Sequence, residues 1–555
     1  MSGPHGFRTV WGWLALAALA VLLVFIVYPV FNIVALSVKS GFSADGGWVQ
    51  LVTDTRYLDA IRNSLVLSFV VTVLCVLIGV PLAYVSARYR FPGKALIVFL
   101  PLLTLVIPEI IAAQTWLMML GNNGLVTRFL RGYGIHLPSF YGWFGLITVM
   151  TFIYYTYVYI GTLAAISGFD KQLEEAAQSL GTSPAKSRLR VMIPVIMPAI
   201  LASALLVFAM VIGNFATSLI LSHGVKLLSV ETYQAAVSEG STSPVMQSTL
   251  ASVSILILAA ILFVNRWLVS RGRYEIVQGR GATPSGLSGL HGLLVGLAAG
   301  LDVLISLLPM ISIVIGAFTA SSGPVMRWGE WTTQNLARVF VTAPTPLINS
   351  LTYAGSATVI GVAFSTLVSY LIIKKPNIIT PWLDYISSVP LALSGTVLGI
   401  GLVVSFNSGW LTLSGTAMMF IVAYVVRRLP FGMRNASSTL YNIPNSIEEA
   451  SISLGSPPLR TFVRVVIPIM VPAIVSAAVL TWTTTVSELS ASVLVYSGGQ
   501  ETLPIQVFRL LNSGLMAYAS AYGLTLLVVI MVPIIVVVKI LKIDIFSSSP
   551  SKPGS

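Results

Sequence analysis

Long apolar stretches recur along the whole chain, and they constrain its fold more than any other feature. Hydrophobic residues make up 56% of the 555 residues and charged residues only 9%, whereas soluble domains carry roughly a quarter charged residues. Because a helix needs about 20 apolar residues to cross a bilayer, we predict an all-α integral membrane protein with about twelve transmembrane helices. Disordered, secreted disulfide-rich and singly anchored chains are excluded.

The predicted spans form two sets of six, separated by a polar stretch at 271–287 that is rich in Gly and Arg. The first set lies near residues 10–38, 64–88, 96–120, 140–168, 191–222 and 246–270. The second set lies near residues 288–318, 348–374, 379–406, 411–430, 465–496 and 519–543.

Positive residues collect on alternate connections between these spans. With a cytoplasmic N-terminus, 22 of the 31 Lys and Arg residues fall on cytoplasmic segments and 9 on outer segments. This bias follows the positive-inside rule, and it predicts that both termini are cytoplasmic. It also accounts for the net charge of +13 without nucleic acid as a partner.

The chain contains an internal repeat. Residues 173–200 and 447–474 align at a constant offset of 274, and 14 of their 28 positions are identical. The triplet Asn-Ser-Leu, at 63–65 and 349–351, provides a second anchor at an offset of 286. Because each copy begins and ends on the same side, we predict parallel repeats related by an axis along the membrane normal. The predicted domains are 1–270 and 288–555.

The repeated stretch connects the fourth and fifth spans of each half, and we call residues 170–194 and 444–468 the coupling loops. Each one is predicted to begin with a short helix that has two acidic residues in its first turn, where the helix dipole favours them. A glycine follows, at position 181 or 455, where the chain turns with positive φ. A short exposed helix between two turns suits a rigid docking element.

These loops resemble the EAA motif of the membrane subunit of binding-protein-dependent ABC importers. That signature reads Glu-Ala-Ala, three residues, Gly, nine residues, and an end similar to Ile-x-Leu-Pro. The first loop fits it with Glu175-Ala176-Ala177 and Gly181. The second fits it with Glu449-Ala450-Ser451 and Gly455, with Ser in place of the second Ala.

The resemblance implies a fused type I importer permease of the MetI-like fold in the bacterial cytoplasmic (inner) membrane. Each half would present one coupling helix to a homodimeric ATPase, and a soluble solute-binding protein would deliver the solute. The chain lacks a Gly-x4-Gly-Lys-Ser/Thr loop, so ATP and Mg are expected on the separate ATPase, with no cofactor and no catalytic residue here. The implied coupling residues are Glu174, Glu175, Ala176, Ala177, Gly181, Glu448, Glu449, Ala450, Ser451 and Gly455.

Two further segments are similar to the ferric-iron-type branch of these importers. They are residues 427–434, Arg-Arg-Leu-Pro-Phe-Gly-Met-Arg, and residues 488–492, Glu-Leu-Ser-Ala-Ser. Ferric iron is therefore the expected solute. The alternatives are 2-aminoethylphosphonate, sugar phosphates and polyamines, which relatives of that branch transport. The three arginines at 427, 428 and 434 are expected to anchor the cytoplasmic end of the tenth helix.

Polar residues inside predicted spans are candidates for the translocation path, because ionisable groups in the hydrocarbon region are costly. Glu488 aligns with Asn214 at the offset of 274. For Glu488 the alternative is a carboxylate that is hydrogen-bonded between helices, and for Glu109 it is a position at a proline kink. The candidates are Glu109, Asn214, Thr217, Ser218, Glu488, Ser490 and Ser492.

Other chemistry has little support in the sequence. The four histidines are scattered without the spacing of metal ligands. The tyrosines at 154, 155, 157 and 159 cannot share one helix face, which favours packing over iron binding. Two parallel six-helix halves also describe secondary transporters, but the paired coupling loops argue against that class. No HExxH motif or catalytic triad supports a membrane enzyme.

Overall fold

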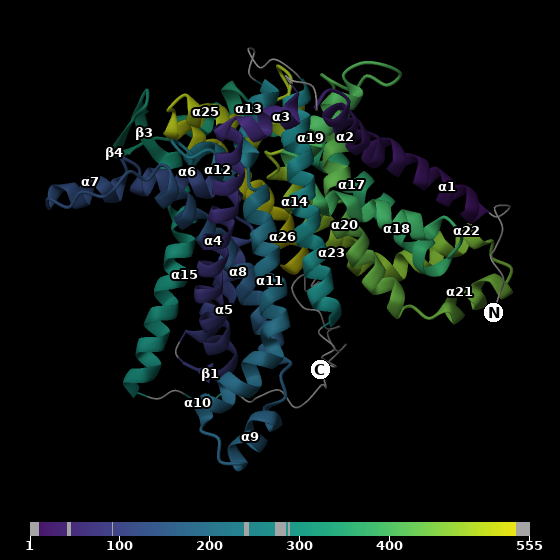
Figure 1. The fold of residues 1–555 in the computed structure, drawn as a ribbon, viewed down its shortest axis with the longest axis horizontal. Helices are drawn as coiled ribbons and strands as arrows, with labels where there is room; N and C mark the ends of the chain where they lie inside the picture. The colour runs from purple at the N-terminus through teal and green to yellow at the C-terminus, as the bar shows by residue number, and fades with distance from the viewer. Residues whose placement is uncertain are drawn as a thin grey trace. The chain divides into compact units, whose positions relative to one another are not determined.

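The structure, a computed structural model, describes residues 10–41, 46–91, 93–237, 244–271, 285–286 and 289–539. Nearly all of these residues are helical (Figure 1), and the strands among them form two short pairs. The predicted all-α membrane fold is confirmed. The predicted linker lies largely outside the described residues.

Among the described residues, nine helices are long and apolar enough to cross a membrane, and two bent pairs raise the number to eleven. The remaining predicted span, near 411–430, corresponds to α20 (Ala417–Asn442). Every stretch of 18 residues in α20 contains Arg427, Arg428 and Arg434, so this helix is the polar exception. The nine are Val10–Lys39, Thr55–Arg88, Trp143–Ser167, Pro184–Gly213, Val245–Leu268, Gly292–Phe318, Thr345–Lys374, Pro458–Val486 and Met516–Val537.

The helices form two compact units, and each unit combines segments from both halves of the sequence. Unit 1 spans residues 1–39, 336–509 and 522–555, and unit 2 spans residues 40–335 and 510–521. The first apolar helix therefore groups with second-half helices, and α15 (Gly289–Phe318) groups with first-half helices. The domain boundaries expected from the repeat remain a prediction.

Unit 2 is built on the long helices α4, α8 and α11. Its described elements are α3 (Gly47–Thr53), α4 (Thr55–Arg88), β1 (Tyr89–Arg90), α5 (Lys94–Thr104), α6 (Glu109–Leu120), α7 (Leu125–Gly132), α8 (Trp143–Ser167), α9 (Lys171–Ser179), α10 (Pro184–Ser187), a π-helical turn (Arg188–Met192), α11 (Ile193–Gly213), α12 (Ala216–Leu221), α13 (Leu228–Val237), α14 (Pro244–Arg271), β2 (Ser285–Gly286), α15, β3 (Thr319–Ser322) and β4 (Val325–Trp331).

Unit 1 is built on α17, α20 and α23. Its described elements are α1 (Val10–Leu22), a π-helical turn (Leu23–Val27), α2 (Tyr28–Gly41), a π-helical turn (Arg338–Thr342), α17 (Thr345–Lys374), α18 (Thr380–Ser388), a 3-10 turn (Val389–Ala392), α19 (Gly395–Phe406), α20, α21 (Asn445–Ser453), α22 (Pro458–Thr461), a π-helical turn (Phe462–Val466), α23 (Ile467–Val486) and α24 (Ser492–Val495). Four helices have residues in both units: α2, whose last two residues belong to unit 2, α16 (Gln334–Ala337), α25 (Leu503–Asn512) and α26 (Met516–Lys539).

Small residues allow the central helices of each unit to pack closely. In unit 2 a Cβ at Gly79 of α4 would lie 2.9 Å from the backbone of α8 at Tyr155. In unit 1 the small residue is Gly432 of α20. A Cβ at this position would lie 2.5 Å from Ser365 Oγ of α17. Close approach of this kind is a common basis of helix packing in membranes.

The third predicted span of each half is broken rather than continuous. The break between α5 and α6 bends the chain by 108°, and that between α18 and α19 by 113°. Pro108, which has no N–H to donate, precedes α6, whereas Ser394 accepts the N–H of Val397 at 3.3 Å and caps α19. Equivalent positions on either side of each break differ by 286, so that Glu109 corresponds to Gly395.

The repeated Asn-Ser pair makes the same contacts in both halves. Ser64 Oγ accepts the N–H of Leu228 at 2.9 Å, and Ser350 Oγ accepts the N–H of Leu503 at 2.7 Å. The neighbouring asparagine side chains donate to the backbone carbonyls of Lys226 (3.1 Å) and Glu501 (3.0 Å). This sequence anchor therefore fastens the start of α13 or α25 to the long helix of its own half.

Candidate functional site

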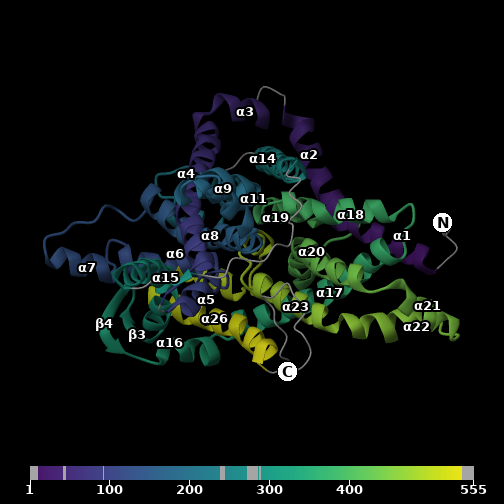
Figure 2. The ribbon, with the colours of Figure 1, turned by 90° about the horizontal axis from the view of Figure 1, so that it is seen from below.

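Each coupling loop contains a nine-residue helix, α9 or α21. In Figure 1, α9 lies at the lower end of unit 2, below α11, and Figures 1 and 2 both show α21 beside α22 at one end of unit 1. Gly181 and Gly455 follow these helices with φ of 88° and 85°, and the two hydrogen bonds of a Schellman motif close each turn. The predicted glycine turns are confirmed in both loops.

One side of each coupling helix is open to solvent. Leu180 and Leu454, the residues before the turn glycines, have exposed fractions of 88% and 89%. Both loops therefore expose a large apolar side chain at the same position of the repeat. The other exposed motif residues are Glu175, Ala176, Gly181, Glu449, Ala450 and Gly455, and Ala177 and Ser451 are half-buried.

The first acidic residue of each pair is turned inward instead. Glu174 is 6% exposed, and its Oε1 accepts from Arg88 Nη2 at 3.0 Å. Glu448 is 4% exposed, and its Oε2 accepts from Lys375 Nζ at 2.9 Å and from the Tyr370 hydroxyl at 2.8 Å. The two glutamates of each motif are therefore not equivalent, because one is buried in an ion pair and the other is exposed.

A buried hydroxyl fastens the segment after each glycine to its coupling helix. Ser187 Oγ, at the end of α10, donates to the carbonyl of Glu174 at 3.2 Å. Thr461, the equivalent residue at the end of α22, shares a 3.0 Å hydrogen bond with the hydroxyl of Ser451. A π-helical turn follows in both loops and leads to a proline in the first turn of the next long helix. Each coupling helix is therefore held by an ion pair to a long helix and by a hydroxyl of the segment that follows it.

Asn214 and Glu488, aligned by the repeat, perform the same local task. Asn214 Oδ1 accepts the N–H of Thr217 at 3.1 Å, and Glu488 Oε1 accepts the N–H of Ala491 at 3.3 Å. Both side chains therefore cap a turn of the chain just before a short helix, at the break between α11 and α12 or between α23 and α24. This shared contact is local, and it is separate from the hydrogen bond between helices that the sequence left open as the alternative for Glu488.

In unit 2, Asn214 belongs to a buried polar centre with Glu109 and Tyr154. The Tyr154 hydroxyl donates to Glu109 Oε1 at 2.5 Å and accepts from Asn214 Nδ2 at 2.8 Å. The structure thus brings together two predicted path residues that are separated by more than 100 positions in the chain. The tyrosine that joins them was expected only to pack.

In unit 1, Glu488 lies between two arginines of α20. Its Oε2 is 2.6 Å from Arg427 Nε and 2.7 Å from Arg428 Nη2, and Arg428 also donates to the carbonyl of Thr484 at 2.7 Å. The helix α20 continues past these arginines to Asn442, and the expected role of Arg427, Arg428 and Arg434 at the cytoplasmic end of the tenth helix stays a prediction. Two cations and one carboxylate leave this centre with a net positive charge.

The predicted hydroxyl residues surround the two centres. Thr217 and Ser218 are buried in unit 2, and Ser490 and Ser492 are buried in unit 1. Ser218 and Ser492 donate to the carbonyls of the capping residues at 2.9 Å and 2.6 Å. The hydroxyls of Ser218 and Ser492 therefore bind the backbone at the two breaks, whereas the buried Oγ1 of Thr217 has no hydrogen-bond partner among the described residues.

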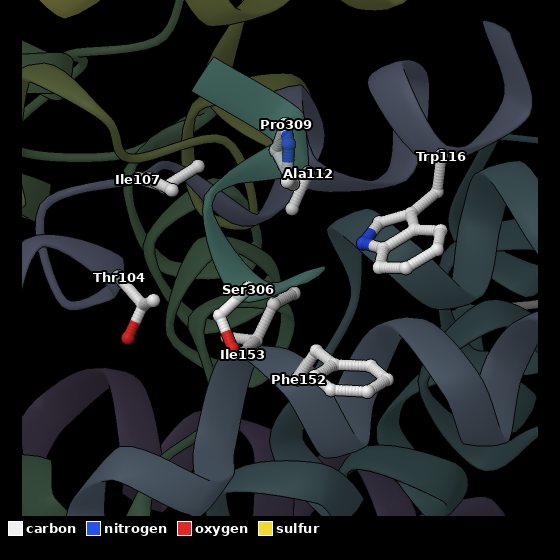
Figure 3. Close-up of a pocket in the computed structure, with 8 residues that line it drawn as sticks. All are labelled: Thr104, Ile107, Ala112, Trp116, Phe152, Ile153, Ser306 and Pro309. Atoms are coloured by element: carbon white, nitrogen blue, oxygen red, sulfur yellow. The ribbon is translucent and has the colours of Figure 1, made fainter. Parts of the chain in front are cut away.

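The cavities of unit 2 differ greatly in size. One cavity beside α6 and α8 has a volume of about 10 Å³, which is room for about one water molecule. Figure 3 shows Trp116 and Phe152 on one side of it and Thr104 on the other. A larger cavity of about 360 Å³ lies at the end of α4, beside Arg88 and Lys94.

The sequence did not point to several residues that the structure brings to these sites. Arg88 and Lys375 hold the inward glutamates, and both belong to basic clusters that the positive-inside rule had explained. The buried Oδ2 of Asp302 has no hydrogen-bond partner among the described residues. The described part of the chain also contains no group of three or more His, Cys, Asp or Glu residues placed to hold a metal.

Comparison with known proteins agrees with the coupling-loop geometry. The family model of the binding-protein-dependent transport system inner membrane component matches residues 75–273 and 357–543. The chain belongs to this family. It is thus a multi-pass inner membrane permease of an ABC importer and not an enzyme, and in such systems a separate ATPase binds ATP.

Similar proteins include ferric transport permeases. The ferric transport system permease protein FbpB of Actinobacillus pleuropneumoniae is 26% identical over 93% of this chain and 76% of its own length. The putative ferric transport system permease protein FbpB 1 of Haemophilus influenzae is 27% identical over 85% of this chain and 76% of its own length. A putative 2-aminoethylphosphonate permease, PhnV, of Salmonella paratyphi A is 32% identical over 27% of this chain and 56% of its own length.

Proposed function

We propose that this permease imports ferric iron delivered by a soluble binding protein. The observation that carries the proposal is the similarity to ferric permeases over nearly the whole chain, both halves included. Similarity to the 2-aminoethylphosphonate permease covers little more than a quarter of the chain. That solute is therefore the second candidate, followed by sugar phosphates and polyamines.

We propose that the two coupling helices dock on the two subunits of a homodimeric ATPase. The exposed residues Glu175 and Glu449, with Leu180 and Leu454 beside the turns, would form the contact. Apolar side chains exposed to this degree are costly in water and gain free energy when a partner covers them. This placement puts the coupling loops and both termini in the cytoplasm, as the charge asymmetry favours.

We propose that the two polar centres line the path of the solute through the membrane. The support is physical, because buried ionisable side chains at helix breaks are rarely retained for packing alone. Glu109, Asn214, Thr217 and Ser218 would contribute from unit 2. Glu488, Ser490 and Ser492 would contribute from unit 1. Closure of the ATPase dimer on ATP would then alternate access to this path.

The test is uptake of radiolabelled ferric ion into proteoliposomes that contain this permease, its ATPase and its binding protein. ATP-dependent accumulation that persists after ion gradients are dissipated is the expected result. Parallel assays with 2-aminoethylphosphonate, a sugar phosphate and a polyamine identify a different solute. Uptake that requires an ion gradient and no ATP would contradict the ATP-driven mechanism.

A further inference from the structure

Each coupling helix is tied to the end of the second long helix of its own half. The Glu174–Arg88 pair joins α9 to the last residue of α4, at 3.0 Å. The Glu448–Lys375 pair joins α21 to the residue that caps α17, at 2.9 Å. Both glutamates and Arg88 are buried, so these contacts are made away from the exposed side of the coupling helix.

The two ties have the same placement but different chemistry. Half one uses a single guanidinium, which also lies 5.7 Å from the Phe169 ring. Half two uses an ammonium together with the Tyr370 hydroxyl. The glutamate occupies the same position of the repeat in both halves, whereas its partners differ. What the two halves share is therefore an ion pair between the coupling helix and the end of a long helix.

We propose that these ion pairs are positioning ties that transmit movement of the coupling helices to α4 and α17. The inference rests on the proposed docking of the coupling helices on the ATPase. The exposed side of α9 or α21 would follow its ATPase subunit, and the buried glutamate would pull the long helix with it. A charged pair taken out of water is costly to separate, so it moves as one piece.

The path from each tie into the membrane is direct. α4 has 34 residues and α17 has 30, and each packs closely against α8 or α20 through the small residues described above. α8 and α20 carry Tyr154 and Arg428, which contact the capping residues of the two polar centres. A displacement of the coupling helix therefore reaches the centre of its own half through two long helices.

The experiment compares variants in proteoliposomes that contain the ATPase and binding protein, and it measures solute uptake and ATP hydrolysis separately. The variants are Glu174→Gln, Arg88→Gln and Arg88→Lys in half one, and Glu448→Gln in half two. Asp59→Asn, a charge removal at an exposed position of α4, is the matched control. Copurification with the ATPase shows whether each complex assembles.

In assembled complexes, Glu174→Gln, Arg88→Gln and Glu448→Gln are expected to lower uptake roughly tenfold while ATP hydrolysis stays within about twofold, a loss typical of interrupted coupling. Arg88→Lys is expected to retain uptake, because half two uses a lysine. The proposal is overturned if the Gln variants transport normally, if uptake and hydrolysis fall in proportion, or if Arg88→Lys behaves like Arg88→Gln. A wild-type complex without ATP-driven uptake would instead refute the proposed function.

Discussion

Replacement of Glu488 by Gln should destabilise unit 1 more than removal of either arginine beside it. Glu488 is the common partner of Arg427 and Arg428. Gln is close in size and can still accept the N–H of Ala491, so the cap is retained. What the variant loses is the negative charge, which leaves two guanidinium groups side by side with side chains only 21% and 15% exposed.

The magnitudes follow from the charge of the centre. Breaking a buried pair by removing one partner costs about 3–5 kcal/mol, and Glu488→Gln should lie in that range because the net charge rises from +1 to +2. Arg428→Met makes the centre neutral and loses the hydrogen bonds to Glu488 and to the carbonyl of Thr484. Because Glu488 keeps Arg427 as a charged partner, the cost should be nearer to that of one charged hydrogen bond, about 1.5–3 kcal/mol. The double variant restores the original net charge and should be more stable than Glu488→Gln alone.

The free energy of unfolding can be measured by titrating SDS into mixed micelles and following tryptophan fluorescence. Asn214→Ala serves as the uncharged comparison. It removes the hydrogen bonds to the Tyr154 hydroxyl and to the N–H of Thr217, and it should cost about 1–3 kcal/mol. If Arg428→Met is as destabilising as Glu488→Gln, or if the double variant is the least stable, the charge argument is incorrect.

Three further outcomes are expected from the same structure. Ser64→Ala and Ser350→Ala should each cost about 1–3 kcal/mol in the same titration, because each leaves a buried N–H without its acceptor, and an unchanged free energy would contradict the anchor. Leu180→Asp and Leu454→Asp should abolish copurification with the ATPase without changing the unfolding midpoint, since both side chains are almost fully exposed; intact assembly would refute the docking surface. Gly79→Leu should prevent accumulation of folded protein, as judged by size-exclusion chromatography, because its Cβ would meet the backbone of α8.

The fold class was predictable because apolar length and charge asymmetry are local properties of a membrane sequence. The coupling turns were predictable for a similar reason: a glycine after an acidic helix can be identified within a dozen residues. A proline kink beside Glu109 was anticipated in the third span of the first half. The matching break in the second half was not, since Leu391-Ala392-Leu393 continues the apolar pattern through the bend. Hydropathy measures whether a segment tolerates lipid, and it does not report the direction of the backbone.

The partners of the site residues were beyond sequence reasoning, because charge alone does not separate a structural pair from a topological signal. Arg88 and Lys375 occur in basic clusters, as the positive-inside rule requires, and nothing in the chain marks them as the residues that hold Glu174 and Glu448. The same difficulty applied to Arg428. It belongs to a basic cluster of the kind found at helix ends, although it lies in the interior of α20. Only the packing of α20 against the chain that follows α23 brings Arg428 to Glu488.

The differences between the two halves are concentrated at their centres. Residues that build the scaffold correspond closely: the turn glycines, the anchoring serines and the inward glutamates occupy equivalent positions with equivalent contacts. At the centres the correspondence fails in charge, since Glu109 is matched by Gly395, Tyr154 by Arg428 and Asn214 by Glu488. The shared scaffold does not require the centres to differ in charge, because the uncharged Asn214 and the charged Glu488 both accept the backbone N–H three residues on. The divergence leaves a centre in unit 2 that contains a carboxylate and a centre in unit 1 with an excess of positive charge.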